Sequence, residues 1–431
     1  MSLTLPAVLF QLPSVRRFFS VLADDLANRR SLLLLLPVGI EPEEIWAALR
    51  VELWRRDFTV AEVSLAGVSK ERAPVAVLSE ALGIAWTPPD TPRTLGNLLA
   101  TEQLPDVVLV EHLDHVSAQT CQEWVVFLSQ WTRACQTRAD RGASSTALCM
   151  VVPATTILPQ PPESSVYLAV HWWWGFPSAL EMHMLCRSRS EQDDWDPVAR
   201  WREYVLPALT GRDVVLATYL WDDLHTSMEG LLRRLCAFAA QRGWTAETLR
   251  AWGAGEGMMA ASRDYRRAQR LPPVEIRSLW AYGAIGWTLE YGLELHTAAL
   301  AVLERREELR HRLWRGQAEL LLPCIDQVRL ALCDYLTRMH GPEWPIRGHL
   351  PESPEEDAAV RHSPLACQWG HLEVLLRHGT LLRAERHWLP LASIARYVRN
   401  EIAHYRPITF RDFEGIWREI ERVTPSVSSY L

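Results

Sequence analysis

The chain has 431 residues, of which 48% are hydrophobic and 23% charged, and its formal net charge is −7. This length suits two or three globular domains, and the composition excludes an intrinsically disordered chain. The acidic balance excludes a broad basic surface that coats nucleic acid, so any contact with RNA must come from a local group of arginines.

The eight cysteines are scattered along the chain, and none of them forms a C-x-x-C pair. Neither a zinc site nor a disulfide framework is therefore expected, and we predict reduced thiols. The apolar run at residues 31–38 is too short to span a bilayer. We expect a cytoplasmic protein without membrane contact, resident metal or cofactor.

The first part of the chain alternates apolar runs, typical of buried strands, with amphipathic segments, typical of helices. The predicted strands lie at residues 31–37, 59–65, 106–113, 147–153 and 166–174. The predicted helices lie at residues 15–28, 43–55, 75–82, 94–103 and 117–138. This alternation predicts an α/β domain over residues 1–190, built on a parallel sheet with crossover helices.

The order of these elements resembles the core of P-loop ATPases of the AAA+ and STAND kind. In that comparison residues 38–42 occupy the position of the phosphate loop, and Glu111 ends the second signature strand. A phosphate loop needs flanking glycines and a Gly-Lys-Ser/Thr ending. Here the loop has a single glycine, Gly39, and the only lysine of the chain is Lys70, after the second strand. We therefore expect a degenerate, P-loop-like domain that does not hydrolyse ATP and that docks on a protein partner.

A dense aromatic patch, His-Trp-Trp-Trp-Gly-Phe-Pro, occupies residues 171–177. Such a patch can serve as a stacking platform for bases or as a partner surface. Packing at a strand end is the favoured interpretation, because helices on both faces of a parallel sheet bury alternating tryptophans.

A polar, acidic stretch at residues 188–197 is typical of a linker, and the chain then becomes helical. We expect helices at residues 197–209, 211–221, 225–242 and 245–252, and a helical lid or linker module over residues 191–295. The four arginines 263, 266, 267 and 270 share one helix face, which is either a solvated face or a stripe for RNA phosphates.

The last part of the chain, residues 296–431, is predicted to be all-α. Long helices are expected at residues 296–314 and 317–339, separated by a polar loop at residues 340–362 from further helices at 367–377, 391–405 and 409–423. The natural arrangement of such helices is a four-helix bundle with a side loop.

One helix of this bundle, residues 391–405, carries groups suited to chemistry. Its apolar residues fall on one side, and Arg399, Asn400 and His404 fall on the other, with Pro407 ending the helix. Residues 399–404 match the R-N-x-x-x-H motif of HEPN ribonuclease domains, which the C-terminal part resembles. The resemblance implies a four-helix fold in which the Arg and His of two subunits face each other and cleave RNA without a metal.

The leading hypothesis is therefore an endoribonuclease effector of a prokaryotic antiphage or abortive-infection system. Its catalytic residues would be Arg399, Asn400 and His404, its substrate RNA, and its assembly a homodimer or larger oligomer through the C-terminal domain. The alternative is a non-catalytic adaptor subunit of a multiprotein defence assembly, in which these side chains form a solvated helix face. Asp326, Arg329 and Glu401 are the polar groups that could approach Arg399 and His404, and we expect each of them to form a surface or inter-helix ion pair rather than to act in catalysis.

Overall fold

The computed structural model describes residues 8–68, 72–86, 91–142, 145–157, 161–189, 196–224, 227–255, 258, 272–288, 292–348 and 354–427. Lys70, the arginine stripe at residues 263–270 and residues 190–195 of the predicted linker lie outside the described residues.

The chain folds into two compact units, each of which is discontinuous in sequence. The first unit comprises Met1–Ser178 and Trp244–His296, and the second comprises Ala179–Gly243 and Thr297–Leu431. These units do not coincide with the three predicted segments, because residues 191–295 are divided between them. The cause is packing: helix α9 (Pro197–Thr210) lies along the later helix α16 (Arg306–His340), within the second unit.

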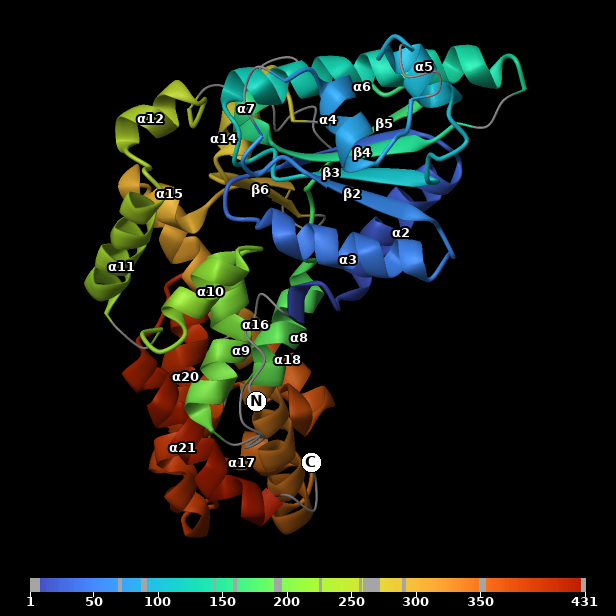
Figure 1. Cartoon of the computed structure of the whole chain (residues 1–431). Helices are drawn as coiled ribbons and strands as arrows, with labels where there is room; N and C mark the ends of the chain where they lie inside the picture. Colours follow the sequence, from blue (N-terminus) through green and yellow to red (C-terminus); the bar gives the residue numbers. More distant parts are fainter. Residues whose placement is uncertain are drawn as a thin grey trace. The chain divides into compact units, whose positions relative to one another are not determined.

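The first unit is built on five parallel strands, all of which the sequence predicts. Their order in the sheet is β2-β3-β4-β1-β5 (Figure 1). Their bounds are β1 (Ser31–Leu36), β2 (Val60–Ser64), β3 (Val107–Glu111), β4 (Ala147–Pro153) and β5 (Leu168–Trp172). In the register, Leu34 of β1 lies between Val151 of β4 and His171 of β5.

The burial of the strands follows their place in the sheet. Every residue of β1 and of β3 is buried, as expected for parallel strands covered on both faces. In the edge strand β2 only Val63 is buried, because one side of this strand has no neighbour in the sheet. The continuous apolar runs in the sequence thus mark the interior strands.

Helices cover both faces of this sheet. In Figure 1, α2 and α3 lie on one face and α4, α5 and α6 on the other. The helices of the unit are α2 (Pro13–Ala27), α3 (Pro42–Trp54), α4 (Pro74–Ala81), α5 (Leu95–Ala100), α6 (Ala118–Ala139), α7 (Ala154–Ile157), α12 (Ala246–Ala251) and α14 (Val274–Ala281).

The unit also contains an antiparallel hairpin, β6 (Ile285–Thr288) and β7 (Gly292–Leu295), where the sequence predicts a helical module. Helix α14, just before the hairpin, packs on the aromatic patch, and the Trp280 indole N–H donates to the Trp173 carbonyl at 3.1 Å. Trp173 and Trp174 are each 5% exposed. The predicted core role of the aromatic patch is therefore confirmed for these two residues.

The second unit consists of helices wherever the structure describes it. They are α8 (Ala179–Arg189), α9, α10 (Val214–Leu220), α11 (Met228–Gln241), α15 (Thr297–Val302), α16, α17 (Trp344–Gly348), α18 (Pro354–His362), α19 (Trp369–His378), α20 (Leu389–Ala403) and α21 (Phe410–Val427), with 3-10 turns at Pro364–Ala366 and Ala384–Trp388. Helices α16, α19, α20 and α21 pack on one another, and α9 packs against α16 and α21. None of the described helices is both long and apolar enough to cross a membrane.

The two long helices predicted at residues 296–314 and 317–339 are wrong in their boundaries. A short helix, α15, ends at Val302, and α16 then runs without a break through Gly316 and Pro323. Gly316 is a point of close contact rather than a helix end, since a Cβ there would lie 2.8 Å from the Tyr204 carbonyl oxygen in α9. The predicted polar loop at residues 340–362 contains two helices, α17 and α18.

Candidate functional site

Helix α20 (Leu389–Ala403) carries the predicted site residues Arg399 and Asn400, and His404 follows it as the C-cap residue. The helix begins with Pro390 in its first turn, where a proline costs no hydrogen bond. The buried residues Leu391, Ala395, Val398 and Ile402 recur at helical spacing and face the interior of the second unit. The opposite face is left to polar side chains.

The predicted site residues all lie on or beside this polar face. Arg399 and His404 are exposed, and Asn400 is half-buried. The Arg399 guanidinium donates to the Asn400 side-chain oxygen at 3.3 Å. His404 is the C-cap residue, and its backbone N–H donates to the carbonyls of Asn400 at 3.0 Å and Glu401 at 3.2 Å. Both ends of the motif are therefore accessible to a ligand.

The backbone just after His404 is fixed by a tight reversal. Tyr405 has φ of 59°, its N–H donates to the Ile402 carbonyl at 3.1 Å, and the Arg406 N–H donates to the Glu401 carbonyl at 2.9 Å. This is the Schellman pattern, which normally places glycine where Tyr405 stands. Trp314 of α16 holds the reversal: its indole N–H donates to the Ile402 carbonyl at 2.7 Å, and its ring lies 4.7 Å from the Tyr405 ring.

The polar groups that the sequence placed near the site have other partners. Arg329 pairs with Asp326 at 2.8 Å and donates to the Cys367 carbonyl at 3.0 Å. Glu401 pairs with Arg406 at 2.7 Å. Each is thus tied to a structural contact, which agrees with the predicted role of these three residues in ion pairs.

The neighbouring turn of α20 is held by a second ion-pair group. Glu373 of α19 accepts from Arg396 at 2.9 Å and from the Ser393 hydroxyl at 2.8 Å, and it also pairs with Arg377. Burial raises the pKa of the Glu373 carboxyl, but the hydrogen bonds from Arg396 and Ser393 outweigh it and leave the pKa below its usual value. This buried carboxylate ties α20 to α19 one turn before Arg399.

The spacing within α20 sets what one copy of the motif can do. Arg399 and His404 are five positions apart, which in an α-helix corresponds to about 7.5 Å along the axis and about 140° around it. One chain therefore presents a guanidinium and an imidazole on different sides of the helix end. A site that grips one phosphate with both groups needs a second copy of this helix, so a shared pocket stays a prediction.

The loop at the phosphate-loop position, residues 38–42, forms hydrogen bonds within the first unit. The Val38 N–H donates to the Ala281 carbonyl of α14 at 2.8 Å, and the Ile40 N–H donates to the Pro37 carbonyl at 3.4 Å. Pro37 and Pro42 have no amide hydrogen. Four of the six residues at positions 37–42 therefore offer no free amide, whereas a phosphate cradle needs several converging amides.

The strand-end carboxylate of Glu111 is also occupied. It pairs with Arg50 of α3, which bridges it to Glu62 of β2. Burial raises the pKa of the Glu111 carboxyl, and Arg50 only partly offsets this. The interpretation of Glu111 as a strand-end carboxylate, rather than a magnesium ligand, fits these contacts.

Two features of the structure were not predicted from the sequence. One is the hydrogen bond from Trp314 to the Ile402 carbonyl at the end of α20, which no local pattern indicates because the two residues are 88 positions apart. The other is a cluster of Glu43, Asp114 and His115 at the sheet edge. A signal did exist for that cluster, since Glu43 opens a helix after β1 and the other two follow β3 directly.

Comparison with known proteins does not identify a family for this chain. No family model and no curated protein matches the chain. Two solved structures of Drosophila ORC with Cdc6, one bound to poly(dA/dT) DNA and the other to GC-rich DNA, each align at 12% identity and a TM-score of 0.27. The alignments cover 95% of this chain and 69% and 70% of those chains. So low a TM-score carries no argument, and it is the five-stranded parallel sheet itself, with helices on both faces, that is compatible with a P-loop-like fold.

Proposed function

We propose that the protein is a metal-independent endoribonuclease of the HEPN type, acting as the effector of a prokaryotic antiphage or abortive-infection system. One observation carries the proposal: Arg399 and His404 are exposed, and Asn400 is half-buried, at the end of a helix whose other face is buried. The resemblance of residues 399–404 to the R-N-x-x-x-H motif supplies the choice of reaction.

The chemistry of these side chains suits cleavage of a phosphodiester. Arg399 binds the scissile phosphate as a charged fork, and Asn400 holds Arg399 through the hydrogen bond already described. The ribose 2′-oxygen attacks phosphorus and loses its proton to one His404, while the bond to the 5′-oxygen breaks. The His404 of a second copy gives the 5′-oxygen its proton, so the products are a 2′,3′-cyclic phosphate and a 5′-hydroxyl.

The first unit then serves as a sensing or docking module. At its phosphate-loop position two amides are already hydrogen-bonded, two residues are prolines and no lysine follows, so we assign it no ATP hydrolysis. A helix-covered parallel sheet without a nucleotide remains a rigid platform for a protein partner.

The test is an RNA cleavage assay with purified wild-type protein and the variants Arg399→Ala and His404→Ala. Wild type should cleave RNA in the presence of EDTA and leave 2′,3′-cyclic phosphate ends, and either variant should lose at least ~100-fold in rate. Matched controls are His378→Ala and Arg418→Ala, which remove an exposed histidine from the end of α19 and an exposed arginine from α21. Both controls should cleave like wild type.

Two results would contradict the proposal. Wild-type cleavage equal to that of the Arg399→Ala/His404→Ala double variant would remove the enzyme assignment, and so would cleavage that EDTA abolishes. A chain that turns over no RNA but co-purifies with one tight partner would instead support the adaptor role.

A further inference from the structure

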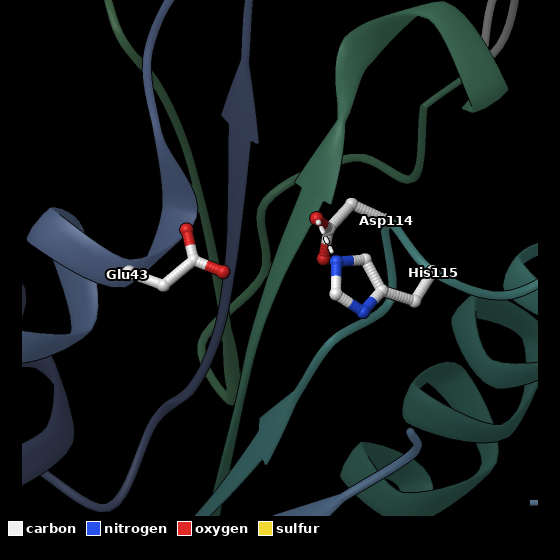
Figure 2. A group of neighbouring side chains, drawn as sticks. All are labelled: Glu43, Asp114 and His115. Atoms are coloured by element: carbon white, nitrogen blue, oxygen red, sulfur yellow. Dashed lines mark ion pairs between the residues drawn. The ribbon is translucent and has the colours of Figure 1, made fainter. Parts of the chain in front are cut away.

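Three side chains with metal-binding chemistry meet at the carboxyl-terminal edge of the parallel sheet. Glu43 lies in the first turn of α3, and Asp114 and His115 lie in the loop between β3 and α6. One ligand atom from each residue lies within 4.8 Å of the other two, and all three side chains are exposed. Figure 2 shows the Glu43 carboxylate directed toward Asp114 and His115.

The fold explains why residues 71 positions apart converge here. Strands β1 and β3 run parallel, so the segments that follow them leave the sheet at the same edge. Glu43 follows β1 after a short loop, and Asp114 follows β3 after two residues. The cluster therefore depends on the register of the sheet and not on a loop conformation alone.

The charge at this edge of the sheet is negative and favours a cation. Three glutamates, Glu41, Glu43 and Glu44, lie at the start of α3. Arg50, on the same helix, forms ion pairs with Glu62 and Glu111. The Asp114 carboxylate pairs with the His115 Nε2 at 3.3 Å, inside the cluster. Among the described residues, no arginine forms an ion pair with Glu43 or Asp114.

We propose that Glu43, Asp114 and His115 bind one divalent transition-metal ion of the Zn²⁺ or Mn²⁺ class. Two carboxylate oxygens and one imidazole nitrogen are a mixed donor set, and the imidazole favours Zn²⁺ over Mg²⁺ or Ca²⁺. Three protein ligands leave further positions for water or for a ligand, as in open zinc sites.

The distances allow such an ion with a small movement. Ligand atoms about 2.1 Å from one ion lie no more than about 4.2 Å from each other. The separation of 3.3 Å between Asp114 and His115 already satisfies this limit. The limit of 4.8 Å for the whole cluster means that Glu43 must approach by less than about an ångström, which an exposed side chain can do by rotation. The bound ion would tie the start of α3 to the loop after β3.

The test is titration of the full chain with ZnCl₂, MnCl₂ and MgCl₂ by calorimetry, in wild type and in Glu43→Gln, Asp114→Asn and His115→Gln. Wild type should bind one Zn²⁺ or Mn²⁺ per chain and bind Mg²⁺ more weakly. Each variant should weaken the affinity at least ~10-fold. Glu41→Gln is the matched control, since it removes a neighbouring carboxylate outside the cluster, and it should bind like wild type.

A second measurement separates this site from adventitious zinc on other histidines or thiols. Co²⁺ bound at the site should give visible absorption bands that His115→Gln removes and Glu41→Gln keeps. Circular dichroism checks that each variant is folded, which we expect because the three side chains are exposed. The proposal is overturned if wild type binds no ion, if the three variants bind as tightly as wild type, or if Mg²⁺ binds as tightly as Zn²⁺.

Discussion

At the scale of single residues, four described helices end on a residue other than glycine in the left-handed conformation. The residues are Arg29, Asp57, Glu304 and Tyr405, with φ between 57° and 59°. In each case the next residue donates back five positions, as from Arg305 to the Leu300 carbonyl at 2.9 Å. The hydrogen bonds of the Schellman motif thus override the steric preference for glycine.

Glu304, at the end of α15, gives a clean test of this cost because it is exposed. Glycine at this position would stabilise the folded state by ~1–2 kcal/mol, because it adopts the left-handed conformation without strain. Its larger conformational entropy in the unfolded chain offsets ~0.5–1 kcal/mol of this gain. We expect Glu304→Gly to raise the free energy of unfolding by ~0.5–1 kcal/mol in a denaturant titration. Glu304→Ala keeps the Cβ and should show no such gain; an equal gain from alanine would disprove the strain argument.

Asp106 joins the amino-terminal ends of β2 and β3. Its carboxylate accepts from the Thr59 hydroxyl at 2.6 Å and backbone N–H at 3.0 Å, and it pairs with Arg29 at 2.8 Å. The Thr59 hydroxyl, followed by the Thr59 amide and Arg29, holds the pKa of Asp106 below its usual value against the effect of burial.

A lowered pKa in the folded state means that Asp106 stabilises the fold above the unfolded-state pKa and that this stability is lost as the pH falls through the lowered value. We expect Asp106→Asn to destabilise the protein by ~1 kcal/mol at pH 7. The difference from wild type should shrink below about pH 4. Denaturant unfolding at pH 7 and pH 3 measures it, and a difference that does not change with pH would contradict the assignment.

At the scale of elements, the contact between α9 and α16 sets the architecture of the second unit. A Cβ at Gly316 would lie 2.8 Å from the Tyr204 carbonyl oxygen and from the Val205 Cα, and 2.9 Å from the Ala208 Cβ. The first two of these atoms belong to backbone and cannot rotate away. A glycine in mid-helix, normally unfavourable, is here the condition for two helices to touch.

Substitution of Gly316 therefore tests helix propensity against packing. Gly316→Ala should gain ~1 kcal/mol in helix propensity and lose ~2–3 kcal/mol through overpacking, with a net destabilisation of ~1–2 kcal/mol. Gly415→Ala in α21 is the control, because its Cβ would meet the Ile394 Cδ1 at 2.9 Å, the end of a flexible side chain. Thermal unfolding should show a lowered midpoint for the first variant and an unchanged or raised midpoint for the second, whereas equal effects would argue against the close contact.

At the scale of the whole molecule, the second unit is assembled from two separate stretches of chain. Trp201 of α9 is 3% exposed and lies 4.8 Å from the Phe413 ring of α21. The helices of residues 179–243 thus form part of the core around α16 and α21. The segment 296–431, which the sequence predicts to be a domain, does not include α9 and the other helices of residues 179–243 that complete this core.

This division predicts how fragments behave. Residues 296–431 produced alone should aggregate or lack cooperative unfolding, because the surface that α9 covers is exposed. Co-production with residues 179–243 should restore a soluble, cooperatively unfolding pair. A fragment 296–431 that is monomeric, helical and cooperative by itself would contradict the importance of α9 for this core.

Local patterns in the sequence determined most of the elements. Apolar runs predict all five parallel strands, and the spacing of Leu391, Val398 and Ile402 predicts α20 with Arg399, Asn400 and His404 on its open side. The missing glycines and lysine predict the loss of the phosphate loop. These features depend on periodicity or turn chemistry within a window of about 15 residues, which a single sequence displays directly.

The tertiary structure alone decided which distant segments meet. Helix α9 packs beside α16 at Gly316, and the Val38 amide donates to the Ala281 carbonyl. Trp314 donates to the last turn of α20, and Glu43 lies near Asp114 and His115. A glycine, a tryptophan or a carboxylate carries no local sign of such a partner. The physical reason is that these contacts follow from the packing of whole helices and from sheet register, which depend on all elements of a unit together.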